Sequence, residues 1–504
     1  MRVPYGSARN IACPGTAARP PRAVVSARIR PARARSARVS ARDRGRTRGP
    51  DGGSRPAPVR PGVRDRSTKD TVKAVQRHLC LNVYLRNSGY HESAWKVTRK
   101  DPRAPLEAGY YADLARTAER GILDAVFLPD SPGMVPFRAE YLPTVGLDPL
   151  ELLASVAVRT DRIGLIATVS TTYTHPWETA RRLATLDFLS GGRAGWNIVT
   201  TVDPVAAGNF GDLPHPERTE RYARAEEFVE VALKLWDGWE EGAALFSKES
   251  GRWADPGRIR APLHQGRHFS VRGPLPLPRS PQGRPLLTQA GSSREGIRLA
   301  AAYADAVFTP QADPESSAAF RQDLRAQAAG FGRAPERVLV LPGLSFVLAD
   351  TERGARQVRA SLEEAASSEF RWRNLAHLAG LDAEDIDPDA PFPPELLSSA
   401  ARTSFGQSIY AMARQGAGTF RDVAQRLSAL PGGLDFTGTP EQLAGLITHW
   451  WRQDAADGFT VMPHLLPDQL DLFVDHVVPI LQRSGLARTE YAGTTLREHV
   501  GCPA

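Results

Sequence analysis

From Gln76 onward, short apolar runs alternate with stretches that have the spacing of amphipathic helices. The apolar runs are nearly continuous, which is typical of strands buried on both faces, and the helical stretches between them can serve as crossover connections of a parallel sheet. Roughly eight such units follow one another in a single series, and this number favours a closed barrel over an open doubly wound sheet. The pattern therefore predicts an α/β fold, a (β/α)8 TIM barrel.

The barrel domain is expected to span residues 73–490, followed by a C-terminal tail at 491–504. The chain is longer than a bare barrel requires, and the surplus predicts insertions near 236–284 and 370–435, one of them a lid. The predicted strands are 78–85, 125–130, 162–171, 190–201, 285–291, 306–310, 337–350 and 459–465, and the predicted helices include 109–121, 148–160, 176–192, 292–304 and 468–485.

An Arg-rich extension precedes the barrel at residues 1–72. Residues 1–70 hold seventeen Arg and one Lys against four Asp, a net charge of +14, so within the chain's total of +8 the remaining 434 residues are acidic at −6. With few aromatic residues and no apolar periodicity, the extension is predicted to be disordered. Its composition is compatible with a transit peptide, a nucleic-acid-binding arm or a segment without function.

Cysteine usage and hydropathy limit the class of protein. The three cysteines have no metal-binding or redox spacing, and no apolar stretch reaches the roughly 18 residues that a membrane-spanning helix needs. These features predict a cytoplasmic enzyme without disulfides, a metal site or a membrane partner.

Polar side chains stand where several predicted strands end. Active sites of TIM barrels are built at the C-terminal ends of the strands, so these side chains are candidate site residues. A strand-end Asp or Thr can also be a helix cap or a loop hydrogen bond, and this alternative stays open for each of them. The candidates are Asp130, Thr168, Thr172, Asn197, Thr200 and Thr201.

The stretch QAGSS at 289–293 ends one strand and begins a helix. Gly291 allows the backbone to approach a ligand closely, and Ser292 and Ser293 lie where free N–H groups and the helix dipole attract an anion. A phosphate group fits this place. The alternative is that Ser292 only caps the helix.

Several common catalytic motifs are absent from the sequence. There is no G-x-G-x-x-G after a strand, no P-loop, no H-E-x-x-H and no G-x-S-x-G. A phosphate site in a barrel without an obvious nucleophile or metal suggests that a cofactor carries the reaction.

Four longer segments of the sequence are distinctive together: ATVSTTYTHPWETARRLATLDFLSGGRAGWNIVTT, GNFG (208–211), ERYARAEEFVEVALKLWDGW (220–239) and HFSVRGPLPLPRSPQGRPLLTQAGSSREG (268–296). In these segments and in their order, the sequence resembles the flavin-dependent monooxygenases of the bacterial luciferase-like superfamily. More narrowly, it is similar to the group that contains nitrilotriacetate monooxygenase component A, dibenzothiophene-sulfone monooxygenase and the pristinamycin IIA synthase subunit. The resemblance covers about residues 76–490.

The resemblance implies a two-component enzyme that takes reduced FMN from a separate NAD(P)H:flavin reductase. Reduced FMN and O2 would form a C4a-hydroperoxyflavin, which oxygenates a small organic substrate. The missing nicotinamide fingerprint agrees with this interpretation, since an enzyme that receives reduced flavin needs no pyridine-nucleotide site. The resemblance also implies a homo-oligomer, a dimer or tetramer, and leaves the substrate open.

The resemblance assigns roles to the candidate residues. Asp130 is placed near the flavin ring, and Thr168 or Thr172 in a strand-end loop beside it. Arg218 stands where related sequences have His, and can contact a phosphate as a charge. His91 is the candidate for stabilising or protonating the peroxide, with His175 as second choice. The resemblance further implies that the flavin ring or ribityl chain is lined by Asn197, Thr200 and Thr201. It also implies that the phosphate is held by Tyr222, Gly291, Ser292 and Ser293.

Two other interpretations of the sequence remain open. A deazaflavin-dependent dehydrogenase of the same superfamily would transfer hydride without O2, but the GWN and QAGSS segments favour the FMN branch. A non-catalytic protein would bind flavin or nucleic acid, the latter through its basic extension. The net negative charge of the rest of the chain argues against nucleic acid as a partner, because nucleic acid is itself negatively charged.

Overall fold

The computed structural model describes residues 78–144, 146–211, 214–291, 293–397, 418–428 and 433–502. The predicted extension at 1–72 and the candidate residue Ser292 lie outside these ranges, as does part of the predicted insertion near 370–435. Within the described ranges, no helix is long and apolar enough to cross a membrane.

Eight parallel strands form a closed ring at the centre of the described fold. They pair in the order β1, β2, β3, β4, β9, β10, β11 and β13, and β13 pairs back to β1. This ring confirms the predicted (β/α)8 TIM barrel. The strands are β1 (Cys80–Tyr84), β2 (Ala125–Leu128), β3 (Gly164–Ser170), β4 (Ala194–Val199), β9 (Leu286–Ala290), β10 (Ala306–Thr309), β11 (Leu339–Leu348) and β13 (Gly458–Pro463).

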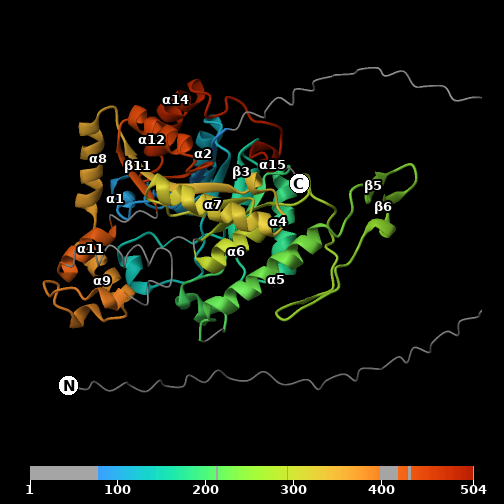
Figure 1. The fold of residues 1–504 in the computed structure, drawn as a ribbon, viewed down its shortest axis with the longest axis horizontal. Coiled ribbons are helices and arrows are strands. Elements are labelled where there is room, and N and C mark those ends of the chain that lie inside the picture. Colours follow the sequence, from blue (N-terminus) through green and yellow to red (C-terminus); the bar gives the residue numbers. More distant parts are fainter. Residues whose placement is uncertain are drawn as a thin grey trace, which may run out of the picture. The chain divides into compact units, whose positions relative to one another are not determined.

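Helices alternate with these strands and cover the barrel (Figure 1). Their starts follow the local sequence: the Asp148 carboxylate accepts from Leu150 N over 2.8 Å at the beginning of α3, and Thr439 forms a capping box with Gln442 at the beginning of α12. The helices are α1 (Ala94–Val97), α2 (Ala108–Arg120), α3 (Pro149–Ala157), α4 (Pro176–Ser190), α5 (Arg218–Trp236), α6 (Arg294–Tyr303), α7 (Pro314–Gly330), α8 (Glu352–Ala365), α9 (Ser368–Ala379), α11 (Phe420–Ser428), α12 (Pro440–Arg452), α13 (Asp468–Leu472), α14 (Val478–Arg483) and α15 (Leu496–His499).

Successive residues of β4 face opposite sides of the barrel wall. Trp196 points outward, because its ring lies 5.7 Å from Phe228 and 6.3 Å from Trp236 of α5. Its indole is fully buried. Since side chains alternate along a strand, the next residue, Asn197, points into the barrel.

The C-terminal segment 487–502 closes the N-terminal end of the barrel. Leu496 packs inside the ring, and a Cβ on Gly164 would lie only 2.4 Å from its Cδ1, so glycine makes room for the leucine at this place. Arg497 is buried and donates to Asp305 over 2.7 Å, just before β10. The described C-terminal residues, up to Cys502, are therefore part of the packed barrel.

The surplus of chain lies in two places on opposite sides of the barrel in Figure 1. Between α5 and β9, two antiparallel hairpins form, β5 (Ala244–Ser247) with β6 (Arg252–Ala254) and β7 (His264–Gln265) with β8 (Ser270–Val271). Between β11 and β13 lie α8, α9, α11 and a strand that the sequence analysis did not predict, β12 (Leu434–Gly438), which pairs with the C-terminal half of β11.

The predicted helix at 468–485 forms as α13 and α14, with a π-helical turn at Phe473–Val477 between them. Pro479 at the start of α14 has no N–H to donate to the preceding turn. A widened turn at this point accommodates the missing hydrogen bond.

Candidate active site

Polar side chains line the inside of the barrel at the C-terminal ends of β3 and β4. Thr168 and Asn197 are opposite each other in the paired strands, and Asn197 Nδ2 donates to Thr168 Oγ1 over 3.0 Å. Ile166, two positions before Thr168, packs in the barrel interior, so Thr168 points to the same side. The bond holds both side chains at the mouth of the barrel.

The loops that follow β3 and β4 are bonded to each other. Ser170 Oγ and Thr201 Oγ1 are 2.6 Å apart, and Thr172 Oγ1 donates to the carbonyl of Thr200 over 2.9 Å. Thr201 has a φ of +32°, a backbone conformation that a β-branched residue rarely adopts. The contacts across the two loops maintain this conformation, and strained residues of this kind are concentrated at functional sites.

A cavity of about 850 Å³ opens at the C-terminal ends of β1, β2 and β3. This volume is in the range of small-molecule sites. Asp130 lines the cavity, and its pKa is raised because its surroundings desolvate the carboxylate and Asp148 lies nearby. The residues that line the cavity include Tyr84, Arg86, Asp130, Arg138, Thr168 and Tyr173.

An aromatic wall that the sequence analysis did not assign lies on one side of this cavity. Tyr173 stacks on Phe210 with ring centroids 4.6 Å apart and an angle of 10° between the planes. Tyr173 Oη is also 2.7 Å from His215 Nδ1. These three residues come from the loops after β3 and β4. In the sequence, the aromatic residues that follow these two strands are the signal that could have predicted this wall. His175, the second-choice histidine, instead caps α4 by accepting from Trp177 N over 3.3 Å.

A second cluster of polar groups surrounds the N-terminus of α6, after β9. Ser293 Oγ accepts from Gly296 N over 3.1 Å and lies 3.5 Å from Tyr222 Oη of α5. Gln289 is buried, and its Oε1 has no hydrogen-bond partner in the described part of the chain. A Cβ on Gly291 would lie 2.8 Å from Gln289 Nε2, so the glycine keeps a small space open between these groups.

The composition of this cluster fits a phosphate group. Tyr222 and Ser293 provide hydroxyl donors, and Gln289 provides an amide, at a helix N-terminus whose free N–H groups favour an anion. Arg218 at the start of α5 adds a positive charge, and its Nη1 lies 3.9 Å from Glu295 Oε2 in the first turn of α6. The structure thus brings together Arg218, Tyr222, Gly291 and Ser293 from distant parts of the chain.

His91 lies in the loop after β1, where the sequence analysis placed it, but its imidazole is engaged. Nδ1 is 2.9 Å from Ser93 Oγ, and Nε2 is 3.2 Å from Glu363 Oε1 of α8. The hydrogen bond from His91, together with Arg371, lowers the pKa of Glu363 to about 2. His91 is buried and is not among the residues that line the 850 Å³ cavity.

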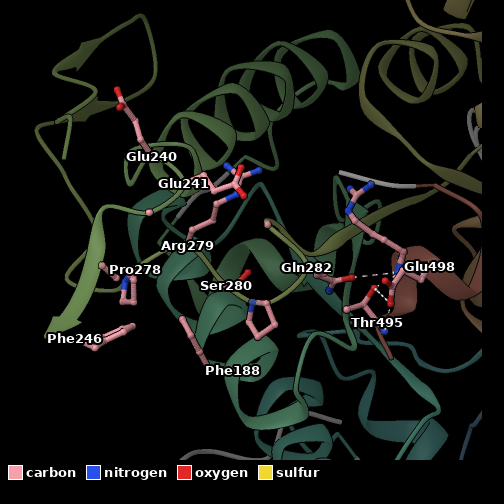
Figure 2. Close-up of a pocket in the computed structure, with 15 residues that line it drawn as sticks. Phe188, Glu240, Glu241, Phe246, Pro278, Arg279, Ser280, Gln282, Thr495 and Glu498 are labelled. Atoms are coloured by element: carbon pink, nitrogen blue, oxygen red, sulfur yellow. Dashed lines mark hydrogen bonds between the residues drawn. The ribbon is translucent and has the colours of Figure 1, made fainter. Parts of the chain in front are cut away.

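Another hollow, of about 580 Å³, lies at the opposite end of the barrel (Figure 2). It is lined by residues that precede β9 and by the C-terminal segment, including Gln282, Thr495 and Glu498. These polar groups bind one another: Gln282 Oε1 accepts from Arg497 N over 3.3 Å, and Thr495 forms a capping box with Glu498. Because the N-terminal end of a TIM barrel serves stability rather than catalysis, the candidate active site is the cavity at the other end.

The polar mouth of the barrel and the donor cluster at the N-terminus of α6 can be compared with known proteins. The family described as luciferase-like monooxygenase matches residues 91–457. The chain belongs to this family. Its activity is that of a flavin-dependent monooxygenase, and the resemblance stated from the sequence is confirmed.

Individual relatives match over most of their length. The chain is 42% identical to N-acetyl-S-(2-succino)cysteine monooxygenase of Bacillus subtilis (strain 168), over 84% of this chain and 97% of the relative. It is 40% identical to nitrilotriacetate monooxygenase component A of Aminobacter aminovorans, over 84% and 96%. A crystal structure of riboflavin lyase with modified FMN and riboflavin superimposes with a TM-score of 0.75 at 31% identity, covering 84% of this chain and 96% of that one.

Proposed function

We propose that this protein binds reduced FMN from a separate NAD(P)H:flavin reductase and uses it with O2 to oxygenate a small organic substrate. The observation that supports FMN is the donor cluster at the N-terminus of α6, which suits a phosphate, at the same end of the barrel as the polar residues of β3 and β4. The structure of a relative with modified FMN agrees with this choice.

In this proposal, the strand-end residues hold the ring and the ribityl chain. Thr168 and Asn197 offer their polar groups at the barrel mouth, and Asp130 lies on the cavity wall near them. The loops containing Thr172, Thr200 and Thr201 are fixed by their mutual hydrogen bonds. A rigid loop loses little conformational entropy when the ligand binds, which favours affinity.

The phosphate end is assigned to the cluster on α5 and α6. Tyr222 and Ser293 donate their hydroxyl groups, Gly291 leaves room for the phosphate oxygens, and Arg218 provides positive charge. Ser292 is predicted to bind the phosphate as well, although it lies outside the described residues.

The protein's own part in the reaction is to bind, orient and exclude water. When bound, reduced flavin supplies the two electrons that convert one atom of O2 to water while the other enters the substrate. The aromatic wall formed by Tyr173 and Phe210 lines the cavity and would cover part of a bound ligand against water. His91 is proposed as a proton donor, which requires that its Nε2 exchange Glu363 for a ligand atom.

Two further properties belong to the proposal. We infer a homo-oligomer, a dimer or tetramer, and a cytoplasmic location in which the reductase partner and reduced nicotinamide are present. The measurement of molar mass by light scattering checks the first, and fractionation of the source cells checks the second.

The two-component function is tested by reconstitution. The purified protein is mixed with NADH and FMN, with or without a separate flavin reductase, and NADH consumption and oxygenated products of a substrate panel are measured. We expect almost no NADH oxidation by the protein alone, and product only with the reductase. Appreciable NADH turnover by this chain alone would refute the proposal. Titration with reduced FMN provides a readout that does not depend on the substrate.

A further inference from the structure

Two arginines lie in the wall of the candidate active-site cavity. Arg86 follows β1, and Arg138 is in a short 3-10 helix after β2 (Pro136–Glu140). Arg86 is exposed, whereas Arg138 is half-buried and its Nε is buried without a hydrogen-bond partner. Within the part of the chain that the structure describes, neither guanidinium has a carboxylate at ion-pair distance.

A third arginine of the same cavity has the opposite character. Arg182 Nη2 lies 2.7 Å from Glu151 Oε2 and 3.2 Å from Asp148 Oδ1, so its charge is already neutralised. Arg182 therefore differs from Arg86 and Arg138, because its guanidinium group already has carboxylate partners from the protein. Arg86 and Arg138 are left available to a ligand.

The charges around Arg138 make an anion favourable. Burial lowers the pKa of Arg138, and repulsion from the positive charge of Arg86 lowers it further. Asp203, which lies beyond ion-pair distance, acts in the opposite direction and raises this pKa. A partly buried cation that lacks a partner carries a desolvation cost, which a bound carboxylate offsets. Asp130 and Asp148 are the acidic groups that line the same cavity. Asp148 is paired with Arg182, and the pKa of Asp130 is raised by desolvation and by Asp148.

We propose that Arg86 and Arg138 bind carboxylate groups of the substrate, and that the substrate of this enzyme is a small polycarboxylate. The proposal rests on the monooxygenase function given above and specifies its substrate class. The planar guanidinium group can bind a carboxylate through two parallel hydrogen bonds, so two arginines select a molecule with at least two such groups. Uncharged sulfones or alkanes would leave both cations without a partner.

The phosphate of FMN is the other anion that could occupy this place. In the barrel, β3 and β4 separate the strands that carry Arg86 and Arg138, β1 and β2, from β9 and the donor cluster that follows it. The cluster of Tyr222 and Ser293 already suits the phosphate. The arginines are therefore assigned to the substrate, and the experiment includes an arm for the phosphate.

The test uses the full chain and the variants Arg86→Gln, Arg138→Gln and Arg86→Lys. Arg159→Gln is the matched control, because Arg159 is an exposed arginine after α3 that does not line the cavity. Nitrilotriacetate and its trimethyl ester are the probes. Their binding to the protein is measured by calorimetry, and their oxygenation is measured with a flavin reductase present. Reduced FMN and reduced riboflavin are titrated in parallel.

We expect binding of nitrilotriacetate but not of its ester. Each Gln variant should weaken this binding roughly ten- to a hundredfold, the loss of one charge-assisted hydrogen-bonded pair. Arg86→Lys should retain more affinity than Arg86→Gln, Arg159→Gln should bind as the parent does, and flavin affinity should be unchanged in all variants.

Several results would overturn the proposal. Equal binding of the ester and the acid, or no effect of the Gln variants on the acid, removes the role of the arginines in substrate selection. A loss of FMN affinity with riboflavin unchanged assigns them to the phosphate instead. Failure of the proposed function looks different: the protein then binds no reduced flavin and oxygenates no substrate, while calorimetry still reports whether the arginines bind the acid.

Discussion

Replacing Ser293 by Asp separates the two roles that this residue can have. In the structure, Ser293 Oγ caps α6 by accepting from Gly296 N over 3.1 Å. Asp is as good an N-cap as Ser, and its negative charge is favourable at a helix N-terminus. The free energy of unfolding should therefore change by less than about 0.5 kcal/mol in Ser293→Asp.

The same substitution should disrupt phosphate binding. It removes a hydroxyl donor, worth about 1.5–3 kcal/mol when the acceptor is charged, and adds a like charge near the phosphate, worth about 1 kcal/mol at 4 Å in a water-like medium. A total of roughly 2.5–4 kcal/mol corresponds to a loss of FMN affinity of about sixty- to a thousandfold. Riboflavin has no phosphate, so its affinity should stay nearly unchanged.

The assay is titration of each variant with reduced FMN and reduced riboflavin under anaerobic conditions, with thermal melts to check folding. Thr351→Asp is the matched control, because Thr351 Oγ1 caps α8 by accepting from Gly354 N over 3.1 Å and lies outside the cluster. An equal loss of both ligands in Ser293→Asp would show that the phosphate site is misplaced. Unchanged affinity for both would show that the serine only caps the helix.

Three further predictions concern the binding of the flavin ring, the Arg-rich extension at residues 1–72 and the C-terminal segment. Asn197→Ala should weaken reduced FMN and riboflavin alike, by roughly tenfold for one hydrogen bond; a loss restricted to FMN in the titration would contradict this. A chain that begins at Val72 should melt and bind flavin as the full chain does, and a large drop in melting temperature would refute it. Burial, with a contribution from Arg488, lowers the pKa of His499 from 6.5 to about 4, so its neutral form stabilises the fold above pH 6.5 and this stability is lost as pH falls toward 4. His499→Phe should flatten the fall in melting temperature over this window, and an unchanged pH profile would contradict the assignment.

The barrel and much of the candidate site could be predicted from local patterns. Alternation of buried strands with amphipathic helices is a property of short windows of sequence, and it specified the ring because parallel strands require crossover connections. Strand-end positions such as Asn197 and helix starts such as Ser293 are also local features. Their common location at one end of the barrel followed from the fold.

Contacts between distant segments were decided only by the tertiary structure. The sequence placed His91 in a strand-end loop, but its bond to Glu363 joins residues 272 positions apart, and no local pattern reports such a pair. The same holds for the stacking of Tyr173 on Phe210 and for Leu496 entering the barrel against Gly164. Whether an arginine such as Arg138 is paired or available depends on which acids the folded chain brings near it. Periodicity determines which face of an element is buried, whereas the partner on that face is set by packing in three dimensions.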